Sequence, residues 1–121
     1  MEVTLIIVSE NVALADLEAA LGKSRLEGHT LGTARPSGAV RRQSIWLRDW
    51  SPSAEPPRSP LWTVLDWLFS KRDDLRAVDP SALVKISVRI QADEGFSASP
   101  DLSAKLAELG VYLIVYPLEE P

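Results

Sequence analysis

The chain has 121 residues, the size of one domain, and its 45% hydrophobic and 25% charged residues are typical of a folded globular protein. It contains no cysteine, which excludes disulfides, thiolate zinc sites and cysteine nucleophiles and fits a reducing compartment. The net charge of −4 disfavours a general nucleic-acid binder, whose affinity needs cationic side chains, and favours a basic partner. We therefore treat residues 1–121 as a single domain.

The first half of the chain predicts a strand, a helix and a hairpin. Residues 3–8 are apolar on both faces, as in a strand at the centre of a sheet, and the run is too short for a signal peptide or membrane span. We expect a cytoplasmic protein without a membrane contact. Asn11 is the expected N-cap of a helix that ends at Gly22. A weaker strand over residues 26–35 and a strand SIWLRDW, residues 44–50, predict a hairpin.

The second half alternates helices and strands. Ser59-Pro60 and Ser99-Pro100 each combine an N-cap serine with a first-turn proline, so each predicts a helix start. LVKISVRIQ, residues 83–91, alternates apolar and polar positions and predicts a strand with one wet face. VYLIVY, residues 111–116, is the last expected strand. The order βαββαβαβ predicts an α+β fold, a two-layer sandwich with helices on one face of a mainly antiparallel sheet.

The strand SIWLRDW leaves open which of its faces meets the helices. Either Trp46, Arg48 and Trp50 or Ile45 and Leu47 must face them. Burying Arg48 between two indoles costs free energy unless its charge is partnered. We therefore expect Trp46, Arg48 and Trp50 on the open face beside Arg89. Trp and Arg are enriched in interface hot spots, so this stripe is the predicted partner-binding surface.

The sequence contains no pattern that indicates a catalytic, cofactor or metal site. Its single histidine, His29, has no nucleophile motif nearby and no second ligand at metal spacing. No glycine-rich phosphate loop is present. Asp93-Glu94 is the acidic pair of most interest, because it lies in a long loop with Phe96. We expect a solvated pair that adds to the partner-binding surface, with a carboxylate-based enzyme as a third alternative.

Five arginines between residues 33 and 58 suggest an alternative function. Beside Trp46 and Trp50 they could grip RNA through stacking and phosphate contacts. The acidic remainder of the chain makes ordinary surface charge the better interpretation. A small RNA-binding module that uses the Trp46/Arg48/Trp50 strand is therefore the second hypothesis.

The run GFSASPDLSAKLAELGVYLIVY, residues 95–116, resembles the closing signature of the bacterial domain of unknown function 4279 family. The pattern is a loop leading to a Phe, a Ser-Pro helix start, spaced leucines, Leu-Gly and a strand ending in Tyr. The residues that carry it are Gly95, Phe96, Ser99, Pro100, Leu102, Leu106, Leu109, Gly110 and Tyr116. A tryptophan in a middle strand, here Trp46, is similar too. The chain departs from the family's Leu-Gly-…-Pro exit after the first helix, where Lys23-Ser24-Arg25 follow Gly22.

The resemblance implies a binding protein, because no activity is established for that family and its members recur among presumed immunity proteins. Our expectation is a non-catalytic domain that binds and neutralises a cognate protein toxin, without a cofactor. A second copy of the chain is the other partner considered. An immunity protein needs a surface and no catalytic residues, which agrees with the sequence.

Overall fold

The computed structural model describes residues 2–50, 59–90 and 96–117. Its seven elements are β1 (Glu2–Ser9), α1 (Leu14–Leu21), β2 (Ser44–Trp50), α2 (Pro60–Val78), β3 (Leu83–Ile90), α3 (Pro100–Leu109) and β4 (Val111–Pro117). The predicted α+β architecture is confirmed. The bounds of α2, β3, α3 and β4 follow the expected ones to within a residue.

The four strands form one sheet in the order β2-β1-β3-β4. The apolar strand β1 lies inside the sheet and runs antiparallel to both β2 and β3. β4 pairs with β3 in parallel, as expected for two strands joined by a crossover helix. The sheet is thus mainly antiparallel, with β2 and β4 at its edges.

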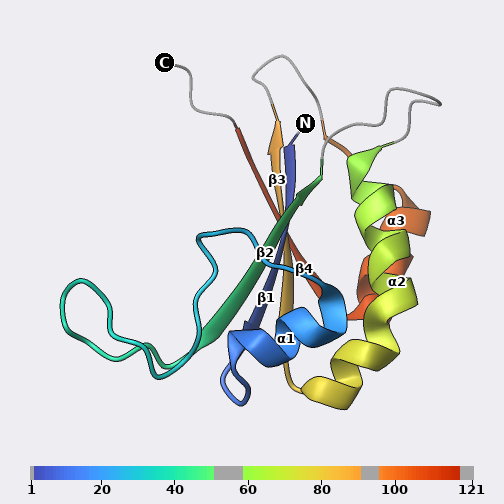
Figure 1. Cartoon of the computed structure of the whole chain (residues 1–121). Coiled ribbons are helices and arrows are strands. Elements are labelled where there is room, and N and C mark those ends of the chain that lie inside the picture. Colours follow the sequence, from blue (N-terminus) through green and yellow to red (C-terminus); the bar gives the residue numbers. More distant parts are fainter. Residues whose placement is uncertain (1, 51–58, 91–95, 118–121) are drawn as a thin grey trace.

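The three helices lie on one side of the sheet (Figure 1). Between the two layers lies a core of aliphatic side chains and one indole: Val3, Leu5, Ile7, Leu17, Trp46, Leu61, Val64, Leu65, Ile86 and Val88. β3 follows the predicted alternation. Val84, Ile86 and Val88 are buried towards the helices, whereas Arg89 is exposed on the other face.

The predicted caps of α3 are confirmed, whereas the predicted N-cap of α1 is wrong. Ser99 accepts a hydrogen bond from the backbone N–H of Leu102 at 3.1 Å, and Gly110 ends α3 in the left-handed conformation at φ 66°. α1 differs from expectation, because Ala13 and not Asn11 is its N-cap. The Asn11 amide instead donates to Asp79 at 3.2 Å and to Ser81 at 2.9 Å. A tertiary contact therefore replaces the expected local cap.

The expected strand over residues 26–35 is reduced to isolated bridges. His29 pairs with Ile45, and Ala34 pairs with Val40, so the hairpin is present without a continuous strand. Between its backbone hydrogen bonds to β2 at Arg25 and His29, the chain makes a turn in which the Gly28 N–H donates to the Arg25 carbonyl at 3.0 Å. Gly28 packs so closely that an added Cβ would lie 2.3 Å from Ser24 Oγ and 2.9 Å from the Ile45 carbonyl oxygen.

The expected orientation of β2 is wrong. Trp46 lies opposite the core residue Ile7 and is 0% exposed, so the side of β2 that carries it faces the helices. By strand alternation alone, burial of Trp46 implies burial of Arg48 on the same side of β2. Because β2 is an edge strand, the Arg48 side chain instead remains exposed, with its guanidinium 4.4 Å from the Trp50 ring centre and 5.3 Å from that of Trp67.

Candidate functional site

Of the six residues predicted to bind a partner, the four that the structure describes do not form one surface, although Trp50 and Arg89 both line a hollow on the open face of the sheet. Arg89 lies on the open face of the sheet, as expected. Trp46 belongs to the core, and Arg48 and Trp50 lie at the helix-side margin of β2. Asp93 and Glu94 lie outside the described residues.

Trp46 and Trp50 take part in an aromatic cluster with Trp67 of α2. The rings of Trp46 and Trp67 stack with centroids 5.7 Å apart, and Trp50 meets Trp67 edge-on at 5.5 Å. The buried Trp46 indole donates a hydrogen bond to the Gly22 carbonyl at 2.8 Å. This cluster fastens the edge of the sheet to α2, which is a structural role.

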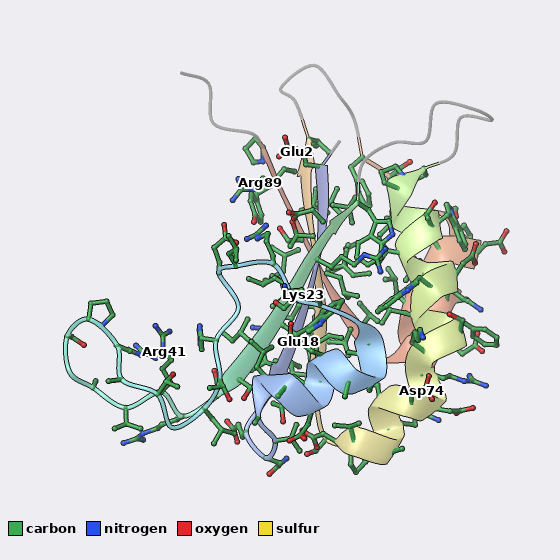
Figure 2. The ribbon with its side chains drawn as sticks, in the orientation of Figure 1. Glu2, Glu18, Lys23, Arg41, Asp74 and Arg89 are labelled. Carbon is green, nitrogen blue, oxygen red and sulfur yellow. The ribbon has the colours of Figure 1, made fainter. Side chains whose placement is uncertain are left out.

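The open face of the sheet contains a hollow of about 460 Å³. Side chains from all four strands and from the segment after α1 contribute to its lining. The polar lining residues are Glu2, Thr4, Arg25, Asp49, Ser87, Arg89 and Tyr116. Figure 2 shows Glu2 and Arg89 at the same end of the sheet, as their direct pairing across β1 and β3 requires.

Asp49 organises one side of the hollow. Its carboxylate receives a hydrogen bond from the Thr4 hydroxyl at 2.6 Å and two from Arg25 Nη1 at 2.8 and 2.9 Å. Burial alone would raise the pKa of the Asp49 carboxyl, but these hydrogen bonds and the positive charges of Arg25 and Arg89 lower it below its usual value. Asp49 is therefore held as a carboxylate.

Tyr116 organises the other side of the hollow. Its hydroxyl shares a 2.6 Å hydrogen bond with the hydroxyl of Ser87, and the Arg89 guanidinium lies 5.2 Å from the centre of its ring. The hydrogen bond with Ser87 and the adjacent Arg89 lower the pKa of the Tyr116 hydroxyl, against the opposing effect of burial. Ser87 is buried, so this pair is fixed in place.

Apolar side chains continue the open face along β4. Tyr112 and Ile114 lie on the same side of the strand as Tyr116 and are 62% and 45% exposed. The described part of the chain places no helix over this face (Figure 1). The surface thus joins two arginines, two tyrosines and an isoleucine, a mixture typical of protein interfaces.

Sequence reasoning missed Arg25, Tyr112 and Tyr116 as members of this surface. The alternation of VYLIVY contains a signal for the two tyrosines, because Tyr112, Ile114 and Tyr116 recur every second residue. Arg25 carries no such signal. It comes to the hollow because its backbone N–H donates to the Leu47 carbonyl, at 2.8 Å, beside β2.

The remaining chemical candidates lie apart from the hollow. His29 is half-buried beside β2, and burial followed by the charges of Arg41 and Arg35 lowers its pKa. Within the described ranges, no three His, Asp or Glu side chains gather where they could hold a metal ion. None of the described helices is long and apolar enough to cross a membrane.

The chain matches no protein-family model, no curated protein and no solved structure at a significant level.

Proposed function

We propose that the chain is a non-catalytic bacterial protein-binding domain, a cytoplasmic immunity protein that binds a cognate toxin and neutralises it. The contact surface is the open face of the sheet around Arg89, Tyr116 and Tyr112. The proposal includes membership of the domain of unknown function 4279 family, which the pattern of residues 95–116 suggests.

The exposed row on β4 is the observation that carries this proposal. Tyr112 and Ile114 expose apolar surface beside the polar hollow, and a tyrosine loses little conformational entropy when it is ordered in an interface. Arg25 and Tyr116 are already held by hydrogen bonds to Asp49 and Ser87. A partner that binds this face therefore meets groups whose positions need little further ordering.

The Asp49–Arg25 and Ser87–Tyr116 pairs also suit a binding surface, because each fixes a polar side chain in one place on the open face. The second hypothesis, RNA binding through the Trp46/Arg48/Trp50 strand, loses its stacking platform because Trp46 is buried.

The test uses the product of the gene immediately upstream as the toxin. Tyr112→Ala should weaken binding in calorimetry by about tenfold or more and reduce protection of cells that express the toxin. Phe69→Ala is the matched control, because Phe69 is an aromatic residue 41% exposed on the helical layer. It should leave affinity and protection unchanged.

Three outcomes would count against the proposal. Wild-type protein that neither binds the neighbouring product nor protects against it would remove the immunity function. Equal losses from Tyr112→Ala and Phe69→Ala would remove the open face as the contact surface. A Tyr112→Ala protein that binds with full affinity and no longer protects would indicate catalysis.

A further inference from the structure

The net charge of −4 is unevenly distributed along the chain, with positive charge concentrated in one segment. Residues 29–45, which we name the basic arm, contain three arginines and no Asp or Glu. The rest of the chain has ten Lys and Arg against 17 Asp and Glu, a net charge of −7. A local charge of +3 on an acidic protein concentrates positive potential at one place.

The basic arm is an ordered projection. Its two limbs are joined by backbone hydrogen bonds of 2.8 Å from Gly32 to Arg41, from Arg41 to Thr33 and from Arg35 to Ala39. Gly38 closes the tip at φ 87°, a conformation that favours glycine. At the base of the arm, Ile45 and His29 exchange hydrogen bonds of 2.8 and 3.1 Å.

The arm leaves the body on the side of the sheet away from α2 and α3, with Arg41 on the projecting limb (Figures 1 and 2). Arg35, Arg41 and Arg42 border a hollow of about 710 Å³ together with His29. Among the described residues, none of these three arginines forms a salt bridge. Burial, followed by the charges of Arg41 and Arg35, lowers the pKa of His29.

The other residues that line the hollow indicate whether an acidic peptide or a nucleic acid suits it better. The rest of the lining comprises four apolar residues, Pro36, Ala39, Val40 and Ile45, with Val40 62% exposed, and two polar ones, Glu10 and Gln43. The Gln43 amide donates a hydrogen bond to the Glu10 carboxylate at 3.3 Å, so the three arginines outnumber a single acid at the hollow. Among the described residues the hollow has no Phe, Tyr or Trp in its lining and only the imidazole of His29, whereas single-stranded nucleic acid is bound by stacking successive bases on aromatic side chains. Arginines beside small apolar side chains suit a peptide that alternates carboxylates with apolar residues.

We propose that the basic arm is a second contact site, which binds an acidic segment of a protein partner through Arg35, Arg41 and Arg42. This inference rests on the proposed function, which identifies the partner as the toxin. The arm and the open face lie on the same side of the molecule, so one partner can contact both. Carboxylates pair with the guanidinium groups, and apolar side chains of the segment pack on Val40 and Ile45. Two sites on one partner raise its total affinity through effective concentration.

The test uses the full chain and needs no toxin. A short fluorescein-labelled peptide rich in glutamate and a labelled oligouridine of equal charge are titrated at low salt and followed by fluorescence anisotropy. Wild-type protein should bind the peptide more tightly than the RNA. The double variant Arg35→Gln/Arg41→Gln should weaken peptide binding by about tenfold or more, since two charge-assisted pairs are lost.

The matched control is Lys23→Gln/Arg76→Gln, which removes the same charge from the end of α1 and from α2 and should bind the peptide as the wild type does. Far-UV circular dichroism of both doubles should match the wild type, since Arg35, Lys23 and Arg76 are exposed and Arg41 is half-buried. Equal losses in both doubles, an unchanged arm variant, or a wild type without peptide affinity would overturn the proposal. Tighter binding of oligouridine, lost in the arm variant, would make the arm a nucleic-acid site instead. If the arm variant bound the peptide as the wild type does while Tyr112→Ala still weakened toxin binding, only this second site would be refuted and the proposed function would stand.

Discussion

Replacing Trp46 by phenylalanine tests the orientation of β2 directly. The Trp46 side chain is fully buried, stacks on Trp67 and donates to the Gly22 carbonyl. Phenylalanine keeps an aromatic ring but lacks the indole nitrogen and two ring carbons. It therefore fits the site without overpacking, and the variant should fold.

The loss of stability follows from what is removed. Two buried carbons contribute roughly 1.6 kcal/mol at ~0.8 kcal/mol each. The hydrogen bond to Gly22 contributes about 1 kcal/mol. Trp46→Phe should therefore lower the free energy of unfolding by about 2.5 kcal/mol, which corresponds to a fall of roughly 10 °C in Tm for a domain of this size.

Urea denaturation followed by circular dichroism measures the change as a shift in midpoint at constant slope. Trp50→Phe is the matched control on the same side of the same strand, and it should cost less than about 1 kcal/mol because Trp50 is half-buried. If Trp46→Phe changed stability by less than about 0.5 kcal/mol, Trp46 would lie outside the core. A larger loss from Trp50→Phe than from Trp46→Phe would equally refute the orientation described here.

Two further predictions concern the packing of loops. Asp79, buried at the end of α2, accepts hydrogen bonds from Ser9 at 2.5 Å and Ser81 at 2.9 Å, and these overcome burial and lower the pKa of its carboxyl. Its stabilising effect is complete above the unfolded-state pKa and is lost as pH falls through the folded-state pKa. Asp79→Asn should thus lower the free energy of unfolding by about 1–3 kcal/mol at neutral pH. In urea titrations the difference from wild type should shrink as pH falls below about 4. A difference that grew in acid would contradict this. Gly28→Ala should destabilise the protein by about 1–3 kcal/mol, because the new Cβ meets Ser24 and the Ile45 carbonyl, and a Tm equal to that of wild type would show that the turn can shift.

Part of the candidate site was predictable from local pattern. The alternation of residues 83–90 correctly puts Arg89 on the open face, and the spacing of residues 111–116 puts Tyr112 and Tyr116 on one side of a strand. The other half of the hollow depends on contacts far apart in the sequence. Arg25 and Asp49 are 24 residues apart, and no periodicity links them.

The sequence by itself determined where most elements begin and end, and which face of β3 is apolar. Ser-Pro starts, the Gly110 stop and strict alternation act within a few residues, so the same local energies operate in any tertiary context. Only the tertiary structure decided the orientation of β2. Both of its faces carry apolar residues, and the choice between them depended on where α2 packs and on the position of β2 at the sheet edge. At an edge the Arg48 guanidinium reaches water across two indole rings, so the core could take Trp46 without burying a charge.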